Sequence, residues 1–189
     1  MTISDLKKEI KHYKPYNEQE KKDQKFMLQY IDQFKEASLL RACVAGHFTT
    51  SVFLFNHDHS KVLMCYHIID DSWAWLGGHA DGLADLRQVV KREIVEESGI
   101  SRFKLTNNEE IAGLTCIAIP GHVKNGKYVS SHVHLDVAFV GEADESEELT
   151  ILPSENEGLA WIDVDSLADK VTDTWKVKRT YLKLIEQYR

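Results

Sequence analysis

The feature that most constrains this chain is a stripe of apolar residues at helical spacing that ends in glutamates. Leu83, Leu86 and Val90 are followed by Glu93 and Glu97, spaced alternately by three and four residues. At 100° per residue these positions share one face of an α-helix. Exposed acids belong opposite an apolar stripe, whereas these two extend it. The pattern therefore predicts a helix that turns carboxylates inward.

The inward carboxylates indicate a metal site. Glu96 falls within the same arc of the helix as Glu93 and Glu97. Carboxylates held together away from water repel one another and lose hydration, so they need a cation or protons. Hard oxygen ligands suit Mg²⁺ or Mn²⁺. We therefore expect one of these ions as the cofactor.

Residues 78–100, GHADGLADLRQVVKREIVEESGI, resemble the Nudix box, the signature of the MutT-like pyrophosphohydrolase family. The family pattern is G-x5-E-x7-R-E-U-x-E-E-x-G-U, where U is apolar, and every defined position but one matches in register. The exception is the first glutamate, which is replaced by Ala84, although Asp81 and Asp85 lie close by. The resemblance extends from about residue 47 to about residue 167.

The resemblance implies a fold and a set of site residues. The expected fold is α/β, a Nudix-like α/β/α sandwich with a mixed sheet. Arg92 would orient the carboxylate beside it, because a planar guanidinium can hold a carboxylate at two points. The metal would be held by a main-chain carbonyl and three acids, namely Gly77, Glu93, Glu96 and Glu97.

The implied activity is Mg²⁺- or Mn²⁺-dependent hydrolysis of the diphosphate bond in a nucleoside diphosphate linked to a second group X. In this family the base that completes water activation often lies outside the box. We expect Glu155 rather than Glu157, because Ser154-Glu155 marks the loop entering a strand. Some Nudix-like domains instead bind nucleotides as sensors without turnover, and Ala84 favours this alternative. A related isoprenoid diphosphate isomerase would need a catalytic cysteine, and no cysteine is placed near the box.

Two residues near the glycine pair 77–78 are candidates for substrate binding. His79 follows the pair directly, so it would lie at the mouth of the site. Trp73 follows the polar residues 70–72, and an exposed aromatic face there could stack on a nucleotide base. Core packing is the alternative role for Trp73.

A third candidate lies on a later strand, where His132, His134 and Asp136 alternate on one face. This face is either a solvent-facing polar side or a surface from which His134 hydrogen-bonds substrate phosphate. Three residues on one flat strand converge poorly on a tetrahedral ion, which disfavours zinc.

Length and periodicity predict one catalytic domain at residues 41–189, preceded by an N-terminal helical extension at residues 1–40 that packs on it. A dimer contact or a lid is the alternative role for the extension. Asn17 is the expected N-cap of its second helix, with Glu20 completing a capping box. Strands are expected at 47–55, 61–69, 73–76, 111–119, 131–140 and 159–162, and helices at 4–13, 17–37, 83–97, 165–170 and 174–188. Residues 120–127 and 142–148 are expected to be loops.

Charge and composition limit the partners and the compartment. The 189-residue chain carries a formal charge of −7, which disfavours binding of a nucleic acid polymer because that needs a basic face. A small diphosphate remains compatible, because divalent ions supply positive charge. No apolar run approaches the ~18 residues of a membrane span. Three widely spaced cysteines indicate reduced thiols in a cytoplasmic protein.

Overall fold

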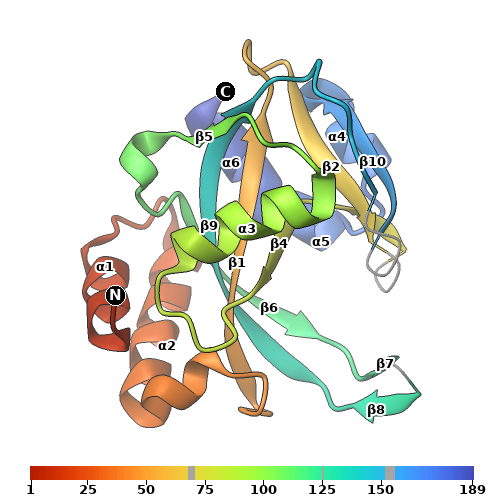
Figure 1. Ribbon diagram of the computed structural model, residues 1–189. Helices are drawn as coiled ribbons and strands as arrows, with labels where there is room; N and C mark the ends of the chain where they lie inside the picture. Colours follow the sequence, from red (N-terminus) through yellow and green to blue (C-terminus); the bar gives the residue numbers. More distant parts are fainter. Residues whose placement is uncertain (68–70, 125, 152–155) are drawn as a thin grey trace.

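The structure is a computed structural model that describes residues 1–67, 71–124, 126–151 and 156–189 (Figure 1). Its first elements are α1 (Ile3–His12), α2 (Glu18–Phe34) and the 3₁₀ helix η1 (Lys35–Leu39). Ile3, Leu6 and Ile10 form the buried face of α1, as their spacing predicts. Thr2 caps this helix by accepting a hydrogen bond from the backbone N–H of Asp5. Within the described residues, no helix is both long enough and apolar enough to cross a bilayer.

A mixed sheet of eight strands forms the centre of the molecule. Its main path runs β10-β2-β1-β9-β5, while β3 pairs with β2, β4 with β1 and β6 with β9. The central strands β1 and β9 are parallel and the other pairs are antiparallel. The strands are β1 (Gly46–Phe55), β2 (Lys61–His67), β3 (Ser72–Ala74), β4 (Leu76–His79), β5 (Phe103–Leu105), β6 (Gly113–Ile119), β9 (His132–Ala143) and β10 (Asn156–Asp163).

Helices cover both faces of this sheet (Figure 1). The N-terminal helices and α3 (Leu86–Ser98) lie on one face, where Phe48 of β1 and Val90 of α3 share a hydrophobic cluster. Phe53, five residues along β1, lies in the second cluster with Tyr181, because alternate residues of a strand point to opposite faces. The second face is covered by α4 (Leu167–Lys170), α5 (Thr174–Lys176), the π-helix η4 (Val177–Tyr181) and α6 (Leu182–Tyr188). The expected α/β/α sandwich with a mixed sheet is confirmed.

Several expected boundaries are wrong. The helix of the box begins at Leu86, and Leu83 is exposed ahead of it, so Leu83 is not part of the buried stripe. The polar segment expected as a loop forms a hairpin of β7 (His122–Lys124) and β8 (Lys127–Val129), helped by Gly126 at a φ of 73°. β9 continues to Ala143, into the expected acidic connection.

Helix α2 is attached to the sheet and to the last helix by a buried ion pair. Lys183 Nζ donates to Glu20 Oε1 at 2.6 Å and to Thr115 Oγ1 at 3.0 Å. The capping role expected for Glu20 is half right, because its backbone N–H donates to Asn17 Oδ1 at 2.9 Å. Its carboxylate instead accepts from Lys183 and from the backbone N–H of Tyr16, so it serves packing rather than a reciprocal capping box.

Candidate active site

Helix α3 presents its glutamates unequally. Glu93 and Glu97 are buried, with exposed fractions of 8% and 3%, and they continue the inward face of the helix. The side chain of Glu96 is 55% exposed, because it stands at the edge of the arc and not within it. The predicted inward turn of carboxylates therefore applies to Glu93 and Glu97, while Glu96 lies at the solvent boundary.

The glycine pair brings the backbone of β4 against these carboxylates. Gly77 N–H donates to Glu97 Oε2 at 2.9 Å. A β-carbon at Gly77 would lie 2.3 Å from the carbonyl oxygen of Thr50, and one at Gly78 would lie 2.4 Å from Cδ of Glu93. A side chain at either position would therefore displace the neighbouring strand or the Glu93 carboxylate.

Arg92 orients Glu93. Its Nη2 atom donates to Glu93 Oε1 at 2.8 Å, and its Nε atom lies 3.7 Å from Glu96 Oε2. The hydrogen bond with Glu93 raises the pKa of Arg92, so this guanidinium stays charged. A buried carboxylate held by a charge-assisted bond has a fixed direction, which is what a ligand of a metal ion needs.

The donor set fits a hard divalent cation. Two buried carboxylates and one at the solvent boundary lie on one helix beside strand backbone, and oxygen ligands of this kind are those that Mg²⁺ and Mn²⁺ prefer. Oxygens of these three carboxylates do not all lie within 4.8 Å of one another, however. Among the described residues, the three ligand atoms that already lie within 4.8 Å of one another belong to His47, His132 and His134.

The position of the missing box glutamate lies in the hydrophobic core. Ala84 is 7% exposed and belongs to the cluster under α3. Of the nearby acids, Asp81 is engaged by Arg41 through two bonds of 2.8 and 2.7 Å. Asp85 accepts from Gln88 Nε2 at 2.9 Å, and its buried Oδ1 has no hydrogen-bond partner within the described part of the chain.

The residues predicted to bind substrate fall in two places. His79 and His134 lie together, with ring centroids 4.9 Å apart, on the face of the sheet opposite α3. Burial lowers the pKa of His79 to about 3 and that of His134 to about 2, so both rings are neutral at pH 7. Trp73 is half-buried and meets Tyr66 edge to face at 5.4 Å. The predicted base Glu155 lies outside the described residues.

The polar face of the strand that carries His134 is buried at Asp136, while His132 and His134 are half-buried. Asp136, two residues along β9, is 2% exposed and accepts hydrogen bonds from Thr49 at 2.9 Å and Ser51 at 2.8 Å. His47, on β1, joins the histidines of β9, and sequence spacing gave no signal for it because it comes from another strand.

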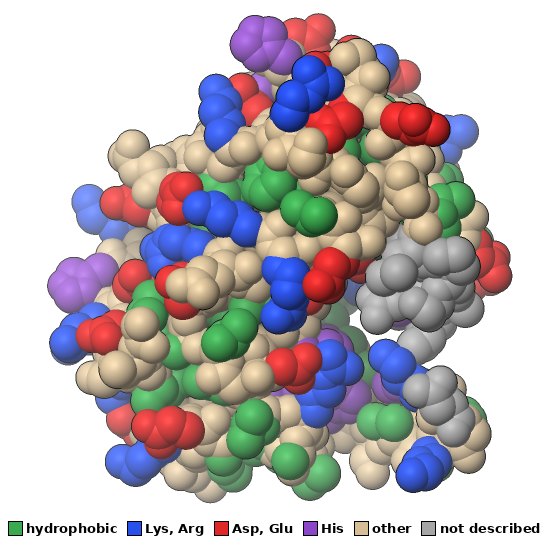
Figure 2. All heavy atoms as spheres, viewed as in Figure 1, with side chains coloured by type: hydrophobic (Ala, Val, Ile, Leu, Met, Phe, Trp, Pro, Cys, Tyr) green, Lys and Arg blue, Asp and Glu red, His purple; other side chains and the backbone are tan. Residues whose placement is uncertain are grey.

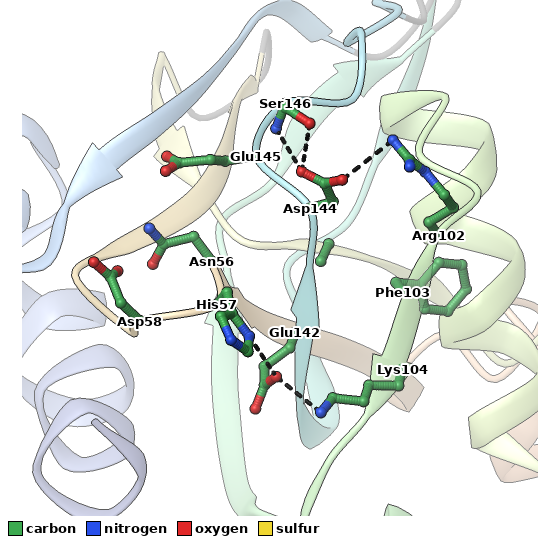
Figure 3. A pocket seen from close by; sticks show the side chains of 11 residues that line it. Asn56, His57, Asp58, Arg102, Phe103, Lys104, Glu142, Asp144, Glu145 and Ser146 are labelled. Carbon is green, nitrogen blue, oxygen red and sulfur yellow. Dashed lines mark hydrogen bonds and ion pairs between the residues drawn. The ribbon is translucent and has the colours of Figure 1, made fainter.

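A wide groove of about 890 Å³ lies apart from these residues, and none of its lining residues belongs to α3 or to the glycine pair (Figure 3). Its two basic side chains are paired with acids, because Lys104 contacts Glu142 at 2.9 Å and Arg102 contacts Asp144 at 3.2 Å. The groove therefore has no unpaired basic side chain among its described lining residues to bind a phosphate.

The fold and the carboxylate helix together are those of a Nudix protein, and comparison with known families agrees. The NUDIX domain model matches residues 46–185, so the chain belongs to the NUDIX domain family. Family membership supports a Nudix-type pyrophosphohydrolase. No curated protein matches the chain.

Solved structures show the same fold. The chain is similar to the MutT protein of Methanosarcina mazei Go1, with a TM-score of 0.55 and 14% identity over 75% of this chain and 94% of that one. It is also similar to a NUDIX family hydrolase from Clostridium perfringens, with a TM-score of 0.52 and 22% identity over 76% of this chain and 98% of that one. A third similar structure is a C. elegans Ap4A hydrolase in a binary complex, with a TM-score of 0.53 and 12% identity over 75% of this chain and 96% of that one. At these identities the likeness concerns the fold alone.

Proposed function

We propose that the protein hydrolyses the diphosphate bond of a nucleoside diphosphate linked to another group, with Mg²⁺ or Mn²⁺ as cofactor. The observation that carries this proposal is the placement of Glu93 and Glu97, two carboxylates buried against the glycine backbone of β4. Burying two acids in one place is costly unless a cation offsets their charge. A divalent ion supplies that charge and polarises the phosphate oxygens when bound.

Each residue of the chain then has a defined task. Glu93, Glu96 and Glu97, with the carbonyl oxygen of Gly77, hold the ion. Arg92 fixes the Glu93 carboxylate, and the N–H of Gly77 fixes that of Glu97. Glu155 is the proposed base that takes a proton from the attacking water. Two phosphate-containing products result from substitution at phosphorus.

Substrate contacts complete the proposal. We assign phosphate hydrogen bonding to His79 and His134, which as neutral rings offer one N–H each rather than a charge. We assign base stacking to the half-buried Trp73. The net charge of −7 supports a small-molecule substrate rather than a nucleic acid polymer.

The proposed setting is the cytoplasm. Of the three cysteines, all within the described residues, none is in a disulfide, which suits a reducing compartment. We propose that residues 1–40 are a helical extension packed on the catalytic domain of residues 41–189, and the ion pair between Glu20 and Lys183 supports this role. A homodimer contact through the extension is the alternative.

A second candidate function is nucleotide sensing without turnover. Ala84 favours it, because the position of the first box glutamate holds a methyl group within the core and contributes no carboxylate. The two functions differ in one outcome: a sensor binds nucleoside diphosphate derivatives with Mg²⁺ and releases no product.

The test is a panel of nucleoside diphosphate derivatives assayed with Mg²⁺, with Mn²⁺ and with excess chelator. We expect hydrolysis of at least one compound, its loss on chelation, and a fall of orders of magnitude in kcat for Glu97→Gln. Glu145→Gln is the matched control, because Glu145 pairs with Lys61 at the distant groove. Activity in excess chelator, or a Glu97→Gln kcat within about threefold of wild type (~1 kcal/mol or less), would refute the metal mechanism.

A further inference from the structure

A group of histidines gathers on the face of the sheet opposite α3. His47 on β1 lies in register with His134 on β9, and His132 is two residues earlier on the same face. The ring of His47 lies 5.1 Å from each of these two rings. In Figure 2 histidine side chains gather beside the notch between the main body and the arm that carries β7 and β8.

This histidine group is separate from the box carboxylates. A side chain at Gly78 would point at Glu93, on the α3 side of the sheet. His79, the next residue of β4, points to the opposite face, where its ring lies 5.0 Å from that of His47. The backbone of β4 therefore stands between the two groups.

Backbone carbonyls fix the direction of two of the rings. Nδ1 of His132 lies 2.8 Å from the carbonyl oxygen of Ser130, and Nδ1 of His47 lies 3.4 Å from that of Cys43. A carbonyl only accepts, so Nδ1 carries the proton in each ring and Nε2 carries the lone pair. Histidine ligands of metal ions are commonly oriented in this way, with the second nitrogen donating to a carbonyl.

Two of the Nε2 atoms face each other, and the third has no partner. Nε2 of His134 donates a hydrogen bond to Nε2 of His132 at 3.1 Å, a proton that a metal ion would replace, and Nε2 of His47 is buried with no hydrogen-bond partner among the described residues. A buried acceptor without a partner is costly, and a cation would satisfy it.

We propose that His47, His132 and His134 bind a transition metal ion of the Zn²⁺ class. Around a tetrahedral ion with Zn–N bonds of ~2.0–2.1 Å, neighbouring nitrogens are ~3.3 Å apart. The separation of 3.1 Å between His132 and His134 matches this, and all three ligand atoms lie within 4.8 Å of one another, so closure needs side-chain shifts of about 1 Å.

The ligand chemistry selects the ion. Three imidazole nitrogens suit Zn²⁺, Co²⁺, Ni²⁺ and Cu²⁺, whereas Mg²⁺ prefers the oxygen ligands on the other face. The site joins two strands, which removes the difficulty of placing three ligands from one flat strand around a tetrahedral ion. Asp136 is not among the ligand atoms that lie within 4.8 Å of one another, and its Oδ1 accepts from Thr49 and Ser51. The inference does not depend on the proposed hydrolysis, and for His134 it is an alternative to the proposed phosphate contact, because Nε2 of that ring would bind the ion.

The test is calorimetric titration of the untagged, chelator-stripped chain with Zn²⁺ in the presence of excess Mg²⁺. A polyhistidine tag must be absent because it binds the same ions. We expect one Zn²⁺ per chain, and Co²⁺ should give the intense visible bands of a low-coordinate complex. His132→Gln should weaken binding by at least about 100-fold, because loss of a ligand costs no less than loss of its supporting partner.

Two controls separate this inference from other outcomes. His122→Gln removes a neighbouring histidine, 6.2 Å from His132 between ring centroids, and should leave Zn²⁺ affinity unchanged. Glu97→Gln should also bind one Zn²⁺, even though it lacks a box carboxylate. Circular dichroism tests whether each variant is folded. If His132→Gln does not fold, His134→Gln is used in its place as the ligand variant. Absence of saturable binding, or equal affinity in a folded ligand variant and wild type, overturns the proposal.

Discussion

Replacing Gly78 by alanine tests whether the position of the Glu93 carboxylate governs turnover. The added β-carbon would lie 2.4 Å from Cδ and 2.5 Å from Oε1 of Glu93, whereas ordinary contact begins at 3.4 Å. Glu93 must therefore retreat by about 1 Å and strain its 2.8 Å bond with Arg92. The φ of Gly78 is not in the left-handed region, so alanine adopts the backbone without strain.

The expected loss follows from this displacement. A misplacement of about 1 Å in a catalytic constellation costs on the order of 100-fold in rate, which is ~2.7 kcal/mol. The flexible end of Glu93 absorbs the clash, so we expect kcat/KM to fall by about this factor while the thermal midpoint changes little. The measurement is steady-state kinetics on the best substrate of the panel, with thermal unfolding recorded for each variant.

A control and a rescue make the test specific. At Gly113 an added β-carbon would lie 3.4 Å from Oε1 of Glu20 and 3.5 Å from Cδ2 of Leu184, which are ordinary contacts, so Gly113→Ala should retain the wild-type rate. Glu93→Asp shortens the side chain by one methylene and should be less harmful in Gly78→Ala than in wild type, which a double-mutant cycle measures. A folded Gly78→Ala variant with kcat/KM within about threefold of wild type would show that the placement of Glu93 does not control turnover.

Four further outcomes are expected. Lys183→Met leaves Glu20 buried without its lysine and should lower the free energy of unfolding by about 3–5 kcal/mol in denaturant titration; a loss below ~1 kcal/mol would contradict the role of the pair. Hydrogen bonds from Ser101 lower the pKa of Glu147 from 4.5 to about 2. The contribution of this carboxylate to stability is therefore present above pH 4.5 and is lost as the pH falls toward 2. The difference in thermal midpoint between wild type and Glu147→Gln should narrow over that range, and a constant difference would refute this role. Ala84→Glu buries a charge in the core and should lower the free energy of unfolding by about 2 kcal/mol. The Mg²⁺ concentration that gives half-maximal rate should not fall, and a lower concentration would show that the new carboxylate reaches the ion. Trp73→Ala should raise KM with kcat nearly unchanged, and an equal fall in kcat would contradict a stacking role.

Regular periodicity explains why much of the fold is predictable from sequence. The stripe that ends in Glu93 and Glu97 identifies the helix and its buried face, because a helix packed on a sheet must bury one side. The predicted start of that helix at Leu83 is wrong, because the spacing of apolar residues does not show that the helix begins only at Leu86. Strand alternation places His134 and Asp136 on one face correctly but cannot show that Thr49 and Ser51 cover Asp136.

Contacts between distant segments account for what sequence analysis misses. His47 has no neighbour in sequence that signals metal binding, and it meets His134 only because β1 and β9 run parallel in register. The carboxylate of Glu20 fits a helix-start pattern, yet it accepts from a lysine 163 residues away. Both partnerships depend on how distant elements pack together, which no single stretch of sequence encodes.

The ion pair between Glu20 and Lys183 also affects how the chain reaches its native state. On the ribosome, Glu20 is made 163 residues before Lys183, so the carboxylate must stay hydrated until its partner has been made. Burying it before Lys183 emerges would leave an unpaired charge in an apolar setting, which opposes premature docking of α2 onto β6. The final packing of α2 is therefore delayed until Lys183 has emerged, and a contact this distant in sequence slows folding. Synthesis and closure of this core are thereby coupled in time.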